Sequence, residues 1–223
     1  MTDESKDIED MIRIASSLVL NIGTLNERTI GSMILAGKEA NDAGIPVILD
    51  PVGAGATKYR TEAVWKILDN VNVSIIKGNE GEIGNLAGKG GKVIGVDSAS
   101  SGGIDAALEL SERTGTVVSM TGKVDVVSNG RRTFTIYSGH DLMSKVSGTG
   151  CMASSVTGCY AGVSEDMLTS AVSALAVFSA AGEMAAQNSA GPGTFKQNLF
   201  DAMHNITRLD VTIRCEIKDI TKV

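Results

Sequence analysis

The stretch from Pro46 to Thr57 reads PVILDPVGAGAT, a short apolar segment that ends in an acidic residue and runs into a glycine-rich turn. Val47 to Asp50 is brief and apolar up to its last residue, which predicts a strand buried on both faces. The residues after the turn, from about Thr61 to Asn70, have the composition of a helix. The stretch therefore predicts one strand-to-helix unit of an α/β fold.

The same alternation of helix and strand continues on both sides of this stretch. Before it we expect a helix from Asp7 to Ser16, a strand from Leu18 to Ile22 and a helix from Arg28 to Ala43. After it we expect strands at Val73 to Lys77, Thr116 to Met120, Val124 to Ser128 and Arg131 to Tyr137, and helices at Ile104 to Thr114, Gly150 to Gly162, Asp166 to Gln187 and Thr194 to Thr207. This order predicts a mainly parallel sheet with helices on both faces.

Length and composition are those of an ordinary globular protein. The 223 residues are enough for a self-sufficient core, so we expect a single domain over residues 1–223. The 26 glycines are more than usual, which indicates tight turns or loops whose backbone approaches a ligand closely. A net charge of -6 argues against broad binding to nucleic acid or to an anionic membrane.

The cysteines and the amino terminus favour a cytoplasmic protein. Three cysteines without metal-ligand spacing argue against both a disulfide framework and structural zinc. The segment from Met1 to Asp10 is acidic and does not resemble a secretory signal. The most apolar segment, Met167 to Gln187, is rich in alanine and serine and carries Glu183, so we expect a core helix and not a membrane span.

Polar and glycine-rich residues follow four of the expected strands. In an open α/β sheet, ligands bind beyond the carboxyl ends of the strands, where loops pass into helices. We therefore expect one cleft to be lined by the segments Asn21 to Thr24, Asp50 to Ala56, Lys77 to Glu82, and Met120 to Gly122.

The segment Ser147-Gly148-Thr149-Gly150-Cys151 precedes an expected helix rich in small residues. A glycine-rich turn at a helix start leaves backbone N–H groups unpaired, and the helix dipole adds positive potential, so a phosphoryl group can bind there. This predicts an anion hole formed by Gly148, Thr149 and Gly150, although the same turn is also typical of a simple helix cap. Cys151 lies in the first turn, where a thiol can act as base or nucleophile, whereas Cys159 and Cys215 are expected to be buried apolar thiols.

Two acidic residues are candidates for a magnesium site. Asp50 ends one strand and Glu82 follows another, so both carboxylates can reach the same cleft and hold Mg²⁺ through waters. The alternative is that Asp50 caps a turn and Glu82 begins a helix. Lys77 offers a cation and Thr121 a hydroxyl to phosphate oxygens, and each is also compatible with an ordinary residue at a strand end.

Taken together, these segments resemble the hydroxyethylthiazole kinase family of the ribokinase-like superfamily. The resemblance covers nearly the whole chain and rests on seven segments in order: NIGTL (Asn21 to Leu25), PVILDPVGAGAT (Pro46 to Thr57) with Arg60, KGNEGEI (Lys77 to Ile83), GVDS (Gly95 to Ser98), TGKVDV (Thr121 to Val126), KVSGTGC (Lys145 to Cys151) and GPGTF (Gly191 to Phe195).

The resemblance implies a ribokinase-like fold and transfer of the ATP γ-phosphoryl group to 4-methyl-5-(2-hydroxyethyl)thiazole, with Mg²⁺, in a homotrimer whose sites lie between subunits. Asp50 and Glu82 match acidic residues near Mg²⁺, and Lys77, Asn79 and Thr121 match the nucleotide site. Met1 and Gly148 match thiazole contacts, and Cys151 matches the cysteine that replaces the aspartate base of other ribokinase-like enzymes.

The resemblance implies about 45 further residues before Met1, with a segment that shapes the thiazole pocket. Either the natural start lies upstream of Met1, or we expect a shortened form that lacks part of that pocket. Two alternatives stay open. One is another small-alcohol kinase of the superfamily, such as hydroxymethylpyrimidine kinase, or the related hydrate dehydratase; Cys151 and the DPVGAGAT run weigh against both. The other is an inactive nucleotide-binding or structural trimer.

Overall fold

The seven strands found in the described residues belong to one sheet. The structure, a computed structural model, describes residues 4–89 and 101–221. The strands lie in the order in which they occur in the chain: β1 (Leu18–Asn21), β2 (Val47–Asp50), β3 (Ile75–Asn79), β4 (Val117–Thr121), β5 (Asp125–Ser128), β6 (Thr133–Tyr137) and β7 (Glu216–Asp219). β1 to β4 pair in parallel and β4 to β7 pair antiparallel, so the expected α/β fold is confirmed and its sheet is mixed.

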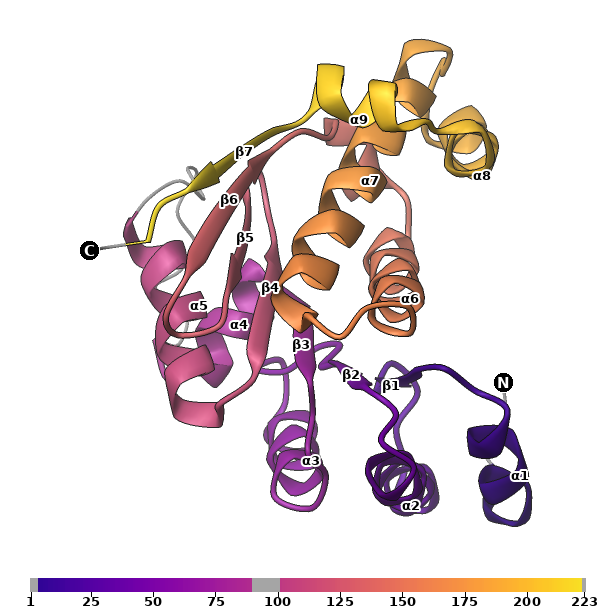
Figure 1. Ribbon diagram of the computed structural model, residues 1–223, viewed down its shortest axis with the longest axis vertical. Helices are drawn as coiled ribbons and strands as arrows, with labels where there is room; N and C mark the ends of the chain where they lie inside the picture. The colour runs from indigo at the N-terminus through magenta and orange to yellow at the C-terminus, as the bar shows by residue number, and fades with distance from the viewer. Residues whose placement is uncertain (1–3, 90–100, 222–223) are drawn as a thin grey trace.

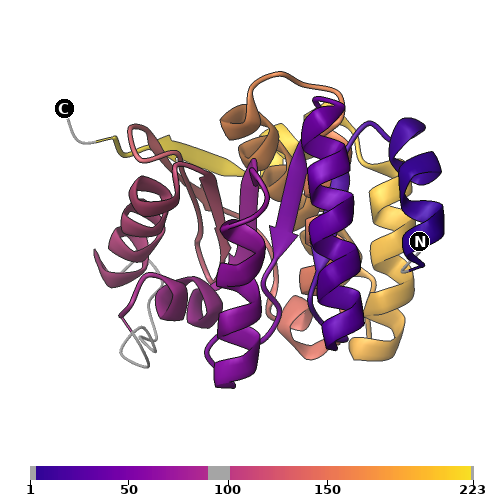
Figure 2. The same cartoon turned by 90° about the horizontal axis from the view of Figure 1, so that it is seen from below.

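Helices cover both faces of the sheet. One face packs against α1 (Ile8–Arg13), α2 (Glu27–Asp42), α3 (Lys58–Leu68), α4 (Glu80–Leu86) and α5 (Ser101–Thr114). The other packs against α6 (Thr149–Ala161), α7 (Met167–Gln187) and α8 (Pro192–Asn205), and α9 (Arg208–Arg214) packs on α7. Figure 1 shows α2 and α3 on one side of the sheet and α6 and α7 on the other, and Figure 2 shows α2 and α3 side by side. Short 3-10 helices, η1 (Ser5–Asp7) and η2 (Asp141–Lys145), precede α1 and α6.

Side-chain caps determine where several helices begin. Asn26 caps α2, Thr57 caps α3 and Asp166 caps α7, each by accepting a hydrogen bond from a backbone N–H of the first turn. Such caps satisfy donors that have no partner within the helix. Because α2 and α3 start directly after glycine-containing turns, the caps also fix the loops at the carboxyl ends of β1 and β2.

Apart from the 3-10 helices, α9 and β7 were not expected from the sequence, and α4 was named only as an alternative role for Glu82. The helix α4 begins directly at the end of β3 and contains two glycines, which weaken its helical pattern. The strand β7 is an edge strand whose four residues, EIKD, are all exposed, so it has no apolar alternation. These elements form because neighbouring elements cap or pair with them.

The long apolar helix α7 is part of the core. In the described part of the chain, it is the one helix long and apolar enough to cross a membrane by length and composition. It packs instead against α6, α8 and the strands β4 to β6, with most of its length buried. This packing matches the core helix expected from its alanine and serine content.

Candidate functional site

The carboxyl ends of the parallel strands lie at one edge of the sheet, beside the first turn of α6. Asn21 ends β1, Asp50 ends β2, and the two residues are paired in register. Asn79 ends β3 and Thr121 ends β4, again as a registered pair. The strand ends predicted to face one cleft are therefore neighbours in the sheet.

Asp50 is buried and held by two side chains. Its exposed fraction is 3%, and its Oδ2 accepts hydrogen bonds from Asn21 Nδ2 at 2.7 Å and from Ser154 Oγ at 2.8 Å. Ser154 lies on α6, so the carboxylate joins two strands to the helix that carries the anion hole. The bonds to Oδ2 leave Oδ1 free to accept from a water or a ligand, because each carboxylate oxygen has its own lone pairs.

Glu82 joins two loops at the same edge. Its Oε1 accepts from the Gly53 N–H and its Oε2 from the Asn79 N–H, both at 2.8 Å, and Asn79 Oδ1 accepts from the Glu82 N–H in return. Burial raises the pKa of Glu82, and the two backbone bonds oppose that rise. Glu82 thus begins α4 through a capping box, which was one of its two interpretations from the sequence, and it also fixes the β2–α3 turn. Its role at Mg²⁺ stays a prediction.

Lys77 is buried beneath α6. Its side chain is 2% exposed, and its Nζ donates to the Gly150 carbonyl at 2.9 Å. Burial lowers its pKa, while Asp50, Glu82 and Asp125 oppose that shift. Its positive charge therefore lies directly under the glycine-rich turn, at the base of the expected phosphate site.

The turn before α6 has the geometry of an anion hole. Gly148 is the N-cap in the left-handed conformation, with φ of +97°, which glycine adopts at no steric cost. The Thr149 hydroxyl donates to the carbonyls of Met143 and Val146, so it fixes the turn from inside. Among the described residues, none accepts a backbone hydrogen bond from the N–H groups of Thr149, Gly150 or Cys151. Gly148 and Gly150 are exposed, so these donors are available to an anion.

Cys151 is exposed in the first turn of α6, and Asn21 Nδ2 lies 3.2 Å from its Sγ. The expectation for the other two cysteines was wrong for Cys159, which is exposed because it falls on the outer side of α6. Cys215 is half-buried, and burial raises the pKa of its thiol to about 11. Cys151 therefore differs from Cys159 by its side-chain donor and not by its exposure.

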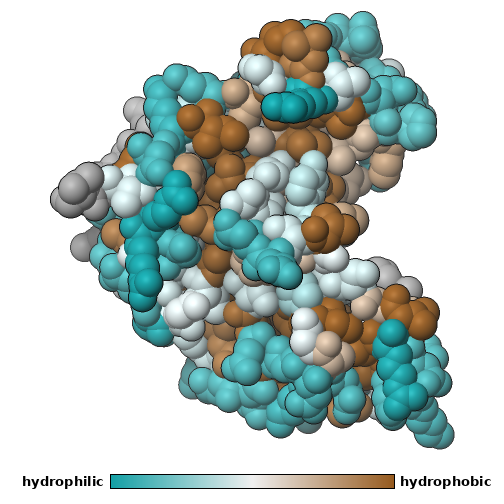
Figure 3. All heavy atoms as spheres, viewed as in Figure 1, coloured by the Kyte–Doolittle hydropathy of each residue, from teal (hydrophilic) through white to brown (hydrophobic). Residues whose placement is uncertain are grey.

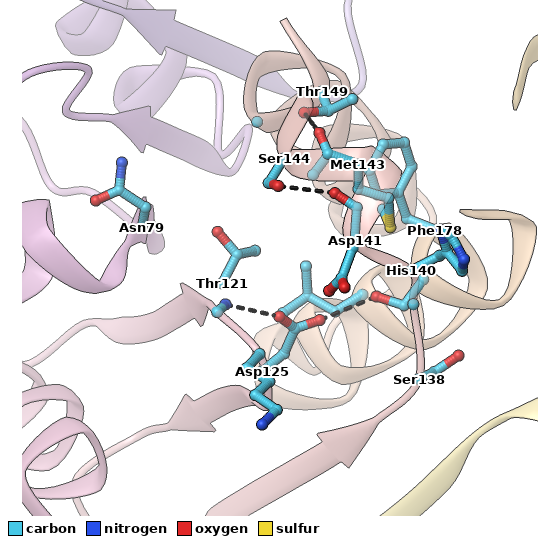
Figure 4. Close-up of a pocket in the computed structure, with 17 residues that line it drawn as sticks. Asn79, Thr121, Asp125, Ser138, His140, Asp141, Met143, Ser144, Thr149 and Phe178 are labelled. Carbon is cyan, nitrogen blue, oxygen red and sulfur yellow. Dashed lines mark hydrogen bonds between the residues drawn. The ribbon is translucent and has the colours of Figure 1, made fainter. Parts of the chain in front are cut away.

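A cavity of about 760 Å³ opens beside the turn, between the ends of β3 and β4 and the helices α6 and α7. Thr149 and Gly150 line it near the anion hole, and Asn79 and Thr121 line it at the strand ends. Met143, Leu175 and Phe178 provide an apolar wall. Figure 4 shows Thr121 and Asp125 on the sheet side facing Met143 and Phe178 across the cavity. Its size and mixed lining are those of a small-ligand pocket.

Asp125 is a site residue that was not expected from the sequence, and Asn21 was expected only as part of a segment lining the cleft. Asp125 lines the cavity, and its carboxylate accepts from the Gly122 N–H and the Ser179 hydroxyl, both at 3.0 Å. Burial raises the pKa of Asp125 to about 6. Each of the two residues is a polar side chain at one end of an apolar strand: Asn21 is the last residue of β1 and Asp125 the first of β5. Their partners Cys151 and Ser179 come from distant segments.

Arg60 connects the loops that follow β1 and β2. Its guanidinium donates to the carbonyls of Ile22, Val52 and Gly23 at 2.8 to 3.0 Å. Both loops follow residues of the site, so Arg60 fixes the backbone around Asn21 and Asp50.

Met1, the expected thiazole contact, and the GVDS segment at 95–98 lie outside the described residues. In the described part, no group of three or more histidine, cysteine or acidic side chains forms a metal cluster. Asp50 and Glu82 still fit a hydrated Mg²⁺, because that ion needs few direct protein ligands and both carboxylates retain acceptor capacity.

Comparison with known proteins identifies the family. Residues 1–208 match the family described as HK: Hydroxyethylthiazole kinase family. The chain belongs to the hydroxyethylthiazole kinase family. A hydroxyethylthiazole kinase of Methanoculleus marisnigri is 46% identical over 221 residues, which are 98% of this chain and 79% of the relative. One of Pyrococcus furiosus is 46% identical over 214 residues, which are 95% of this chain and 80% of the relative.

Solved structures agree with this family assignment. The hydroxyethylthiazole kinase structure from Pyrococcus horikoshii OT3 superposes with a TM-score of 0.91 at 37% identity, covering 99% of this chain and 83% of that one. A pyridoxal kinase of Staphylococcus aureus, in complex with AMP-PCP and pyridoxal, has a TM-score of 0.61 at 16% identity, covering 96% and 77%. That second similarity shows the fold alone, and the ribokinase-like fold implied by the resemblance is confirmed.

Proposed function

We propose that this member of the hydroxyethylthiazole kinase family transfers the γ-phosphoryl group of ATP to the hydroxyl of 4-methyl-5-(2-hydroxyethyl)thiazole. The observation that supports this most directly is the glycine-rich turn before α6. Its free N–H groups border a ligand-sized cavity on one side and the exposed thiol of Cys151 on the other. In-line phosphoryl transfer needs the leaving nucleotide on one side of the phosphoryl group and the attacking alcohol, with its base, on the other. The anion hole lies between the cavity and Cys151, which matches this arrangement.

The nucleotide occupies the cavity in this proposal. Asn79 and Thr121 contact it from the strand ends, and its γ-phosphate lies at the N–H groups of Gly148, Thr149 and Gly150. Lys77 lies on the inner side of the glycine-rich turn, where its ammonium donates to the Gly150 carbonyl. From there its positive charge stabilises the negative charge of the γ-phosphate. The loose transition state of phosphoryl transfer leaves most of the catalysis to such positioning and charge stabilisation.

Asp50 and Glu82 are the residues that would hold Mg²⁺, through waters on their remaining lone pairs. When bound, the ion neutralises charge on the phosphate oxygens. Each carboxylate accepts two hydrogen bonds from the protein, Asp50 from side chains and Glu82 from backbone N–H groups. These bonds fix the orientation of both carboxylates before a ligand binds.

Cys151 receives the proton of the acceptor alcohol. As the hydroxyl oxygen bonds to the γ-phosphorus, the bond from that phosphorus to the β–γ bridging oxygen breaks, and ADP leaves. The hydroxyl proton passes to the thiolate form of Cys151 late in this step and leaves a neutral thiol, because little negative charge builds on the attacking oxygen. Gly148 contributes to the acceptor side of the site.

We further propose that the chain assembles as a homotrimer, in which a neighbouring subunit completes the acceptor pocket, and that it acts in the cytoplasm. Exposed apolar side chains support association: Met11 and Ile14 in and after α1, and Phe200, Leu209 and Ile213 on α8 and α9. Figure 3 shows hydrophobic side chains at both ends of a face that is hollowed between them.

Steady-state ADP formation tests the proposal with two alcohols, hydroxyethylthiazole and hydroxymethylpyrimidine, each with and without Mg²⁺. We expect ADP release only with the thiazole alcohol and only with Mg²⁺. ADP release with the pyrimidine alcohol instead would show a different small-alcohol kinase. Nucleotide binding without turnover on either alcohol would show an inactive nucleotide-binding protein.

A further inference from the structure

The side chain of Asn21 makes three hydrogen bonds at the centre of the site. Its Oδ1 accepts from the Gly23 N–H at 2.8 Å. Its Nδ2 donates to Asp50 Oδ2 at 2.7 Å and to Cys151 Sγ at 3.2 Å. Both hydrogens of the amide nitrogen are therefore used, one on each of two groups that can carry negative charge.

The chemistry of these partners determines which way the amide faces. A backbone N–H can only donate, and an ionised carboxylate can only accept. The oxygen of Asn21 must then face Gly23, and the nitrogen must face Asp50. Cys151 lies on the nitrogen side, so its sulfur is the acceptor of an N–H bond.

The backbone around Asn21 supports this orientation. A Cβ at Gly23 would lie 2.8 Å from Asn21 Oδ1, so glycine permits the close approach of the amide oxygen. Arg60 holds the carbonyls of Ile22 and Gly23, which keeps the loop in place. The side chain is thus fixed from the strand side before it contacts α6.

We propose that Asn21 is a positioning residue for phosphoryl transfer, which holds the sulfur of Cys151 beside the anion hole and separates it from the carboxylate of Asp50. This inference rests on the proposed function of Cys151. In the reaction the thiolate takes the hydroxyl proton while the new P–O bond forms and ADP leaves. The N–H of Asn21 keeps the sulfur lone pair in place for that transfer and offsets repulsion between the thiolate and Asp50.

A double-mutant cycle with Asn21→Ala and Cys151→Ala tests the inference. We expect Asn21→Ala alone to lower kcat by about 10- to 100-fold, the effect of a hydrogen bond to a charged group, with little change in the KM for ATP. In the Cys151→Ala background the factor by which Asn21→Ala lowers kcat should be at least about threefold smaller, because the loss that acts through the sulfur is gone and only the loss that acts through Asp50 remains. Equal losses in both backgrounds would overturn the inference.

The matched control is Asn41→Ala. Asn41 also makes one donor and one acceptor bond, to the backbone of Asn72, at the opposite end of the parallel strands. It should lower stability without coupling to Cys151. If Asn21→Ala does not accumulate as folded protein, Asn21→Ser replaces it in the same cycle. A smaller loss of kcat in the Cys151→Ala background would again support the inference, and equal losses would overturn it.

Thiol labelling gives a second readout that needs no turnover. Cys159 is an exposed thiol on the same helix and serves as the internal reference. We expect Asn21→Ala to change the iodoacetamide labelling rate of Cys151 at least about threefold relative to Cys159, because the sulfur loses the N–H donor that fixes its position. An unchanged ratio contradicts the inference. Failure of the wild-type protein to phosphorylate the alcohol would refute the proposed function but leave this labelling test in force.

Discussion

Lys77 and Asp125 are ionisable groups buried under the site. The ammonium of Lys77 is surrounded by the carboxylates of Asp50, Glu82 and Asp125, which compensate part of the cost of burying it. The carboxylate of Asp125 is compensated by the Gly122 N–H and the Ser179 hydroxyl. Each of these residues therefore affects both the stability of the fold and the charge presented to a phosphate.

Asp125 makes stability depend on pH. Its pKa rises from 3.8 to about 6 on folding, so the folded protein binds this proton more tightly than the unfolded chain. Below pH 3.8, where Asp125 is protonated in both states, its ionisation does not affect the stability of the fold. As pH rises from 3.8 to about 6, the unfolded chain loses this proton before the folded protein does, so the stability falls. Asp125→Asn should therefore gain stability relative to wild type, by on the order of 2 kcal/mol between pH 4 and pH 7.

Urea denaturation of both proteins at pH 4, 5 and 7 measures this difference. The altered hydrogen bonds in the variant change its free energy of unfolding by the same amount at every pH. The prediction therefore concerns how the difference between the two proteins changes with pH. A constant difference across the three pH values would show that folding does not raise the pKa of Asp125.

Cys151→Ala should lower turnover by roughly 10²–10⁴-fold, the usual effect of losing a general base. Binding of ATP should change little, because the anion hole is made of backbone groups. Cys159→Ala, on the same helix, should leave turnover unchanged. Steady-state kinetics of the three proteins checks this, and full activity of Cys151→Ala would remove the thiol from the reaction.

At the scale of elements, apolar runs in the sequence were sufficient to predict the strands of the parallel half. β2 lies where Val47 to Asp50 was expected, and β3 and β4 shift by only one or two residues. The hairpin of β5 and β6 was also predicted, with Gly130 in the left-handed conformation in its turn. β7 was not predictable, because an exposed edge strand forms only through pairing with β6.

Two helical glycines should respond oppositely to alanine. A Cβ at Gly158, where α6 packs on β1, would lie 2.7 Å from Val19 Cγ2, and the stiff valine cannot easily move. Gly158→Ala should lower the free energy of unfolding by about 1–2 kcal/mol, since overpacking outweighs the gain in helix propensity. Gly31→Ala, on α2 with nothing within 4 Å, should raise it by up to about 1 kcal/mol. Urea denaturation at one pH measures both, and a stabilising Gly158→Ala would refute the close packing of α6.

At the scale of the whole molecule, the location of the site was predictable and its internal contacts were not. The rule that ligands bind at the carboxyl ends of parallel strands brought Asn21, Asp50, Asn79 and Thr121 together correctly. The burial of Lys77 and the bond from Ser154 to Asp50 depend on how α6 packs over the sheet. Such contacts join residues about a hundred positions apart, and local patterns carry no information about them.

Assembly is a separate prediction at this scale. The exposed apolar side chains of α1, α8 and α9 should be covered in a homotrimer. Sedimentation equilibrium should give a mass of three chains at micromolar concentration. A monomer across the concentration range would contradict a site shared between subunits.

The most direct test of the proposed reaction is the chemical identity of its product. The protein is incubated with Mg²⁺, γ-labelled ATP and hydroxyethylthiazole, and the products are separated and examined by phosphorus NMR and mass spectrometry. We predict a labelled phosphate monoester on the hydroxyethyl oxygen, formed in equal amount to ADP. Label found only in inorganic phosphate, or remaining in ATP, would contradict the account.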